Sequence, residues 1–249
     1  MADPRRPALL AVAHGTRDPA GPAAVRDLLD RVRAMRPGLR VAEAYGELSE
    51  PSLEEAASGA AGGPVVVVPL MLARGYHALI DIPDRAARLL PGSVAARPLG
   101  PDPLLAEALA RRLGECAQTR IPPRRTDAVV LGAAGSADPA GSEDVRAAAR
   151  LLARRLRRPV THGFVAAGGP ALDEVVAERR RRGARRVVVA SYLLAPGRFL
   201  DRARSCGADA VTAPVGADDA VARLVLRRYD EARSLVSGPV SVRRRSSAR

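Results

Sequence analysis

The stretch ALLAVAHGTRDPAG, residues 8–21, holds the signals from which the fold can be predicted. Ala8–Ala13 is a short apolar run, which predicts a buried strand, and it ends in the loop sequence HGTRDPAG. Apolar residues then recur at helical spacing from about Pro22, and proline suits the first position of a helix. A strand that leads through a loop into a helix is the building unit of parallel α/β sheets.

The same stretch recurs in the second half of the chain. HGTRDPAG at 14–21 matches AGSADPAG at 134–141. VVVVPLMLARGYH at 65–77 matches VVVASYLLAPGRF at 187–199. We therefore interpret the chain as an internal duplication of one α/β unit.

Strand and helix signals alternate in both copies, which predicts parallel sheets with helical crossovers. The expected strands are Ala8–Ala13, Arg40–Tyr45, Val65–Pro69, Ser93–Ala96, Ala128–Leu131, Val160–Phe164 and Arg186–Ser191. The expected helices begin near Pro22, Ser52, Leu79, Asp102, Ser142, Ala171, Gly197 and Asp218. The predicted fold class is α/β, with two similar lobes that each have a central parallel sheet flanked by helices.

The chain is expected to divide at QTRIPPRR, residues 118–125, because paired prolines and arginines do not continue a helix. The first lobe is then expected to span 7–118 and the second 126–236. The remaining residues, 237–249, contain several arginines and no acidic residue, and we expect a disordered basic tail.

Composition limits the classes of function. The formal charge is +13, and all 40 basic residues are arginine because the sequence has no lysine. With 4 Tyr, 2 Phe and no Trp, aromatic platforms for nucleic-acid bases are scarce, and a small polyanionic substrate suits the charge at least as well. Cys116 and Cys206 form no zinc or iron–sulfur motif. Without a membrane-length apolar run or a signal peptide, we expect a cytoplasmic protein with neither a nucleic-acid nor a membrane partner.

Three polar residues of the first half stand where predicted strands end. His14 follows the first strand, Glu47 the second and His77 the third. Loops at the carboxyl ends of neighbouring parallel strands converge, because the strands lie about 4.8 Å apart. Two imidazoles and one carboxylate suit a divalent ion such as Fe²⁺, Co²⁺, Ni²⁺ or Zn²⁺ and leave coordination positions open.

The second copy lacks all three of these residues. Ala134 stands opposite His14 and Phe199 opposite His77. Aligning YGELSEP with HGFVAAGGP, with one inserted residue, places Phe164 opposite Glu47. An isolated histidine is more often a capping group than a ligand, but a joint loss favours one shared site in the first half.

The remaining polar residues of these motifs have more ordinary interpretations. Asp18 and Asp138 survive in both copies, which indicates a turn or helix-entry role through bonds to the backbone. His162 is interpreted as a surface or capping residue. Arg17, replaced by alanine in the second copy, could contact an anionic substrate.

The combination of HGTRDPAG, ELSEPSLEEA and VVVVPLMLARGYHALIDIP resembles the sirohydrochlorin chelatase family, most specifically over residues 9–84. This family inserts cobalt in corrinoid synthesis or iron in sirohaem synthesis, and its long members contain two similar halves. The resemblance implies a class II chelatase fold, with two α/β lobes that face one another across a cleft. It implies that His14 and His77 bind the incoming metal, and that Glu47 binds metal or accepts pyrrole protons.

The implied substrates are a divalent metal, Fe²⁺ or Co²⁺, and a tetrapyrrole with several carboxylates; no permanently bound cofactor is expected. Arg17 and Arg74 are candidates to pair with the carboxylates, and Leu72, Leu79 and Ile80 to contact the ring faces. Two alternatives remain open: a metal or tetrapyrrole carrier or sensor, and another metal-dependent enzyme that uses the same three residues. A monomer and a homodimer are both compatible with the sequence.

Overall fold

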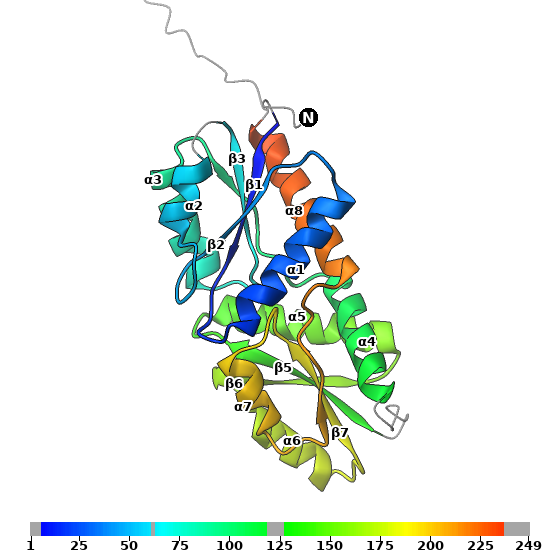
Figure 1. The fold of residues 1–249 in the computed structure, drawn as a ribbon. Helices are drawn as coiled ribbons and strands as arrows, with labels where there is room; N and C mark the ends of the chain where they lie inside the picture. The colour runs from blue at the N-terminus through cyan, green and yellow to red at the C-terminus, as the bar shows by residue number, and fades with distance from the viewer. Residues whose placement is uncertain (1–5, 61–62, 119–126, 237–249) are drawn as a thin grey trace, which may run out of the picture.

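The computed structural model describes residues 6–60, 63–118 and 127–236, which form two stacked α/β lobes (Figure 1). Each lobe has a four-stranded parallel sheet. The first sheet has the order β2 (Val41–Tyr45), β1 (Ala8–Ala13), β3 (Val65–Pro69) and β4 (Val94–Ala95). The second has the order β6 (Val160–Ala167), β5 (Ala128–Gly135), β7 (Val187–Tyr192) and β8 (Ala210–Val211). The predicted fold class is confirmed.

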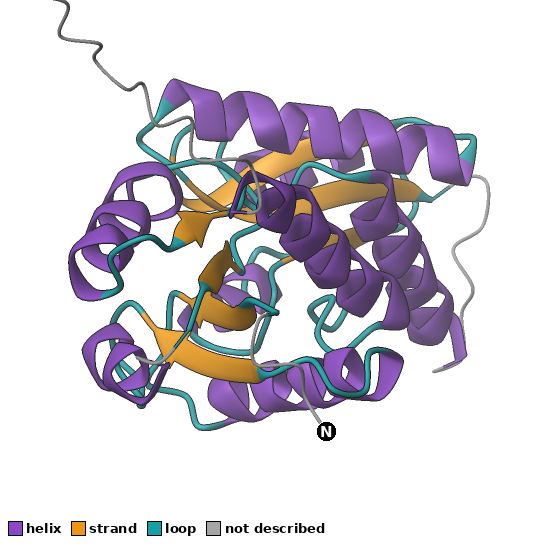
Figure 2. Ribbon diagram, turned by 90° about the horizontal axis from the view of Figure 1, so that it is seen from above, coloured by secondary structure: helices purple, strands orange, loops and turns teal. Residues whose placement is uncertain are grey.

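Helices cover both faces of the sheets (Figure 2). They are α1 (Ala20–Met35), α2 (Leu53–Ala60), α3 (Ile82–Leu89), α4 (Pro103–Gln118), α5 (Pro139–Leu156), α6 (Leu172–Arg181), α7 (Arg198–Arg204) and α8 (Asp219–Val236). A one-turn π-helix, η1 (His77–Asp81), precedes α3. Every residue of β1, β3 and β7 is buried, as expected for strands covered on both faces. No helix in the described part of the chain combines the length and apolar composition needed to cross a bilayer.

Three helices begin differently from the sequence-based expectation. Because the Asp138 carboxylate accepts a hydrogen bond from the backbone of Ala140, α5 begins at Pro139 rather than Ser142. The Asp18 carboxylate likewise accepts a hydrogen bond from the backbone N–H of Ala20, and α1 begins at Ala20 rather than at Pro22. The predicted turn role of both aspartates is thus confirmed. The third difference is η1, a π-helical turn that precedes α3.

The last helix of each repeat packs on the other repeat's sheet. The first repeat's α4 packs against α5 and β7, whereas α8 packs against α1, β3 and β4 (Figure 1). The expected ranges 7–118 and 126–236 follow the repeats along the chain. In the packed structure, however, the first lobe contains α8 of the second repeat, and the second lobe contains α4 of the first repeat. Linker residues 119–125 and the expected tail 237–249 lie outside the described residues.

Equivalent arginines fasten the exchanged helices. Arg228 of α8 is fully buried, donates to the carbonyl oxygens of Pro98 (2.9 Å) and Leu99 (2.7 Å), and lies 3.0 Å from the carboxylate of buried Asp102. In the other lobe, Arg112 of α4 donates to the carbonyls of Pro214 and Val215 at 2.9 and 3.1 Å. The two arginines lie in matching sequences, ARRLGE (110–115) and LRRYDE (226–231), so they are equivalent in the two repeats.

The strand register corrects one detail of the repeat alignment. Tyr45 pairs with Ala13 in the first sheet, and Phe164 pairs with Ala133 at the equivalent place in the second. Phe164 therefore corresponds to Tyr45, and the prediction that it stands opposite Glu47 is wrong.

An alanine takes the place of Glu47 in the second copy. The carbonyl oxygen of Glu47 faces Gly15, and the carbonyl oxygen of Ala167 faces Gly135 in the same way. A register shift after Ala133 accommodates an extra residue in β6, which sequence matching alone misplaces. The loss of the carboxylate from the second copy therefore stands, with a different residue in its place.

Candidate active site

His14 and His77 meet at the carboxyl-terminal edge of the first sheet. His14 directly follows β1, and His77 opens the π-helical turn after β3. Their ring centroids lie 4.8 Å apart and their planes are tilted by 47°. Both residues are half-buried, so the imidazole pair is supported by the protein and still reachable.

Glu47 is held beside this pair by backbone bonds between the two loops. Its N–H donates to the carbonyl of His14 at 2.9 Å. Gly15 adopts φ +95°, and a Cβ at that position would lie 1.7 Å from the carbonyl oxygen of Glu47, so only glycine permits this approach. The carboxylate oxygen Oε1 of Glu47 lies 3.9 Å from Nε2 of His77. The structure therefore brings together the three residues that the sequence singles out.

The three side chains form an open arrangement. Within residues 6–60, 63–118 and 127–236, no group of three His, Cys, Asp or Glu side chains is arranged to hold a metal ion by itself. A site of this kind offers two imidazoles on one side and leaves further coordination to other ligands.

A second layer of charged residues supports His77, and the sequence interpretation missed it. Asp81 Oδ2 lies 3.3 Å from Nδ1 of His77 and 3.4 Å from a guanidinium nitrogen of Arg85. Arg85 also donates to the carbonyl of Gly46 (3.0 Å) and pairs with Glu54 at 2.8 Å. Arg85 thus links the His77 turn to the Glu47 loop. The available signal was the four-residue spacing of His77 and Asp81 on one helical face.

Burial lowers the pKa of His14, and the neighbouring His77 lowers it further. The nearby carboxylates of Glu47 and Asp81 oppose this shift but do not outweigh it. Because a metal-binding imidazole must be neutral, the shift keeps His14 ready to bind a cation at a lower pH than an ordinary histidine.

Exposed apolar side chains lie close in sequence to His77 and Glu47. Leu79 and Ile80, on the π-helical turn, are 45% and 50% exposed, which keeps them available for contact with a flat apolar ligand. Tyr76 and Leu48 are also exposed, and the ring centroid of Tyr76 lies 5.6 Å from that of His77. Leu72 differs: it is packed in the main core, so the prediction that its side chain contacts a ligand is not supported.

The two candidate arginines have different environments. Arg17 is exposed and has no hydrogen bond or ion pair within the described part of the chain. Arg74 makes a two-pronged ion pair with Asp144 of the second repeat, at 2.7–3.1 Å, and the Asp144 side chain is 4% exposed. Its guanidinium therefore ties the two repeats together, and because 44% of the Arg74 side chain is exposed, its contact with a substrate carboxylate stays a prediction.

Within residues 127–236, the second copy has no pair of imidazoles at the carboxyl ends of its strands. Its register places Val65 and Val187 at equivalent positions, so Phe199 corresponds to His77. His162 corresponds to Glu43, not to a ligand position, and it is half-buried within β6. The rings of His162 and Phe164 make an edge-type contact, with centroids 5.7 Å apart and planes at 74°. His14 and His77, the two histidines that meet at a sheet edge, both belong to the first repeat.

This fold and its single imidazole pair define a two-lobed α/β protein of the chelatase type. A family model, CbiX, matches residues 8–116 and again residues 128–232, which correspond to the two repeats. The chain belongs to the CbiX family.

Relatives with named activities match most of the chain. The sirohydrochlorin cobaltochelatase of Priestia megaterium is 29% identical over 206 residues, which cover 78% of this chain and 66% of that protein. A sirohydrochlorin ferrochelatase of the same organism is 27% identical over 199 residues, or 76% and 74% of the two chains. Among solved structures, SirB from Bacillus subtilis with Fe³⁺ superposes with a TM-score of 0.74 at 26% identity, covering 91% of this chain and 95% of that one.

Proposed function

We propose that this protein inserts a divalent metal ion, Fe²⁺ or Co²⁺, into sirohydrochlorin. The observation that carries the proposal is the meeting of His14, Glu47 and His77 at one sheet edge, in the first repeat only. The metal and the macrocycle are both substrates. The relatives named above support this activity, and they include both a cobaltochelatase and a ferrochelatase.

The proposed residues supply what metal insertion requires. A tetrapyrrole loses two N–H protons as M²⁺ enters, so a base near the ion assists the exchange. His14 and His77 would hold the ion through neutral imidazole nitrogens. Glu47, 3.9 Å from His77 Nε2, would accept a pyrrole proton or complete the coordination. Few protein ligands favour release of the ion into the macrocycle, because a closed set of strong ligands would retain it.

The surroundings of the pair suit a flat, anionic macrocycle. Leu79, Ile80 and Tyr76 offer exposed apolar surface for its ring faces. Arg17, which is exposed on the loop that carries His14, would pair with a peripheral carboxylate.

An anaerobic absorbance assay tests the proposal. Substoichiometric protein is mixed with sirohydrochlorin and, in parallel, Fe²⁺ or Co²⁺. We expect many turnovers to the metallated spectrum, faster than without protein, and the ratio of the two rates ranks the metals. Conversion limited to one equivalent would instead indicate a carrier, and absence of any change would refute the proposed activity.

Titration of His14 should have its midpoint below the ordinary histidine value of 6.5, since burial and His77 both disfavour the charged ring. The folded-state pKa is lowered, so any stability linked to this group is present above the unfolded value and is lost as the pH falls. NMR of ring-labelled histidine, with the His14 signal identified by its absence in His14→Ala, measures the midpoint. A midpoint above 6.5 would contradict this electrostatic description.

Asp81→Asn is expected to reduce the rate of metal insertion by about tenfold, because a carboxylate that bonds the second nitrogen of a metal-binding imidazole fixes its orientation. The KM for the macrocycle should change little, since Asp81 acts through His77. Asp84→Asn is the matched control, because Asp84 is exposed on the next turn of α3. Steady-state assays measure the rate and the KM of both variants. Equal rates for Asp81→Asn and Asp84→Asn would exclude a positioning role for Asp81.

A further inference from the structure

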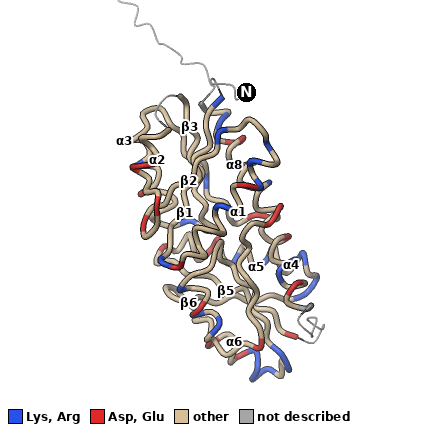
Figure 3. The backbone as a smooth tube through the Cα atoms, in the orientation of Figure 1, with Lys and Arg blue, Asp and Glu red and all other residues tan. Residues whose placement is uncertain are grey.

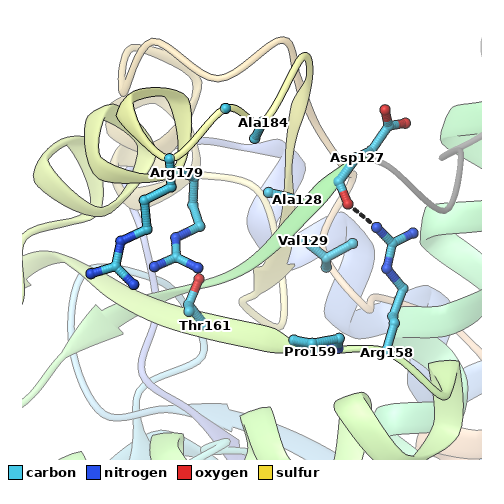
Figure 4. A pocket seen from close by; sticks show the side chains of 10 residues that line it. Asp127, Ala128, Val129, Arg158, Pro159, Thr161, Arg179 and Ala184 are labelled. Atoms are coloured by element: carbon cyan, nitrogen blue, oxygen red, sulfur yellow. Dashed lines mark hydrogen bonds between the residues drawn. The ribbon is translucent and has the colours of Figure 1, made fainter.

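The second lobe contains a cavity of about 300 Å³ that the proposed activity does not use. It lies where β5 and β6 begin, beside the end of α6 (Figure 4). The imidazole pair, in contrast, lies where the strands of the first sheet end. The cavity therefore lies at the amino-terminal ends of the strands of the second sheet. The proposed metal site lies at the carboxyl-terminal ends of the strands of the first sheet.

Two polar atoms of the cavity lining are buried without a hydrogen-bond partner among the described residues: Nε of Arg179 and Oγ1 of Thr161. Figure 4 shows the Arg179 side chain extending from α6 towards the strand that carries Thr161. Both atoms can donate a hydrogen bond. A buried donor without an acceptor is unfavourable, so two of them in one cavity indicate a missing acceptor.

The cavity is also rich in positive charge. Arg158, Arg179 and Arg182 line it, and the basic end of α6 lies at the far end of the second lobe in Figure 3. Asp127 also lines the cavity, but its carboxylate lies 3.6 Å from Arg186. Arg182 pairs with Glu178 on its own helix. The nearby carboxylates are thus already engaged, and within the described part of the chain Arg179 has no acidic partner.

This polar lining is a property of the second repeat alone. Strand register and the bridges Tyr45–Ser52 and Phe164–Ala171 align the two repeats here. The polar residues of the cavity then correspond to apolar residues of the first repeat: Arg158 to Leu39, Thr161 to Ala42 and Arg179 to Ala60. Among the described residues, the first repeat therefore has apolar side chains at these three positions, where the second has polar ones.

We propose that this cavity binds a small tetrahedral oxyanion, such as inorganic phosphate or sulfate. The anion would accept hydrogen bonds from Nε of Arg179 and from the hydroxyl of Thr161, and the guanidinium charge would strengthen the first of these. It would also balance the excess of arginine over carboxylate in the lining. This site is distinct from any carboxylate-binding contact of the macrocycle, because it faces the other edge of the other sheet.

Isothermal titration of the metal-free protein with phosphate, sulfate and acetate, at constant ionic strength, tests the proposal. We expect saturable binding of one equivalent of phosphate or sulfate and much weaker binding of acetate. Arg179→Gln should weaken binding by about tenfold, and Thr161→Val, which keeps the shape of the side chain, by about threefold. Arg181→Gln is the matched control, since Arg181 lies on the same helix end, pairs with Glu178 and does not line the cavity.

The outcomes separate this proposal from the proposed activity. Absence of saturable binding by phosphate or sulfate would overturn it, and so would equal losses in Arg179→Gln and Arg181→Gln. Acetate binding as tight as phosphate would refute the tetrahedral preference. The rate of metal insertion by Thr161→Val should match the unmodified protein in either case, which also shows that the variant is folded.

Discussion

Replacing either His14 or His77, the proposed metal-binding residues, by alanine is expected to lower the rate of metal insertion by at least about 100-fold. The two imidazole rings lie side by side at this sheet edge, with centroids 4.8 Å apart. Removal of either leaves a single imidazole to hold the incoming ion. Both residues are only half-buried, so His14→Ala and His77→Ala should unfold at nearly the same temperature as the unmodified protein.

The third histidine provides the control for this experiment. His162 lies in β6 of the second lobe, away from the pair, and His162→Ala should insert metal at the unmodified rate. The measurement is the initial rate of the absorbance change under anaerobic conditions, together with thermal unfolding of each variant. Full activity in both His14→Ala and His77→Ala would rule out the site. Loss of activity accompanied by loss of structure would be resolved with the smaller change His→Asn.

Arg228→Ala is expected to lower the free energy of unfolding by about 3–5 kcal/mol, which is the range for removing one partner of a buried ion pair. Arg228 is fully buried and Asp102 is 5% exposed, so the carboxylate would lose its buried partner and keep its contact with Arg227, whose side chain is 43% exposed. The carbonyl oxygens of Pro98 and Leu99 would also lose their donors. Because Arg228 belongs to α8, the substitution weakens the packing of this second-repeat helix against the first lobe.

Equilibrium denaturation in urea measures this loss. Arg97→Ala is the matched control: Arg97 also pairs with an acidic residue of α8, Glu231, but its side chain is 60% exposed. An exposed pair contributes at most about 1 kcal/mol. If Arg228→Ala destabilised the protein no more than Arg97→Ala, the buried arginine would not be what fastens the exchanged helix.

The contrast between the histidines and Arg74 shows what local sequence can reveal. His14, Glu47 and His77 each follow a strand, and parallel topology brings the ends of neighbouring strands to one edge. Arg74 lies in the same motif as His77, yet its partner is Asp144, seventy positions away. The motif indicates that this segment contributes to a functional site. It does not indicate which of its side chains face a ligand and which connect the two lobes.

Leu72 illustrates the same limit for apolar residues. An apolar side chain near a site can face a ligand or the core, and the sequence pattern is the same for both. Here Leu72 enters the core, and its carbonyl accepts a hydrogen bond from the hydroxyl of Tyr192 in the second repeat at 2.6 Å. Leu79 and Ile80, on the π-helical turn, remain exposed.

The sequence by itself determined the alternation of strands and helices in each repeat, the duplication and the three residues that follow strands of the first repeat, because these follow from local periodicity and from the loops that end each strand. Only the tertiary structure decided the exchange of α4 and α8, the support of His77 by Asp81 and Arg85, and the polar cavity of the second lobe. Each of these depends on side chains that meet across the packed elements, and the spacing of residues along the chain does not specify such meetings.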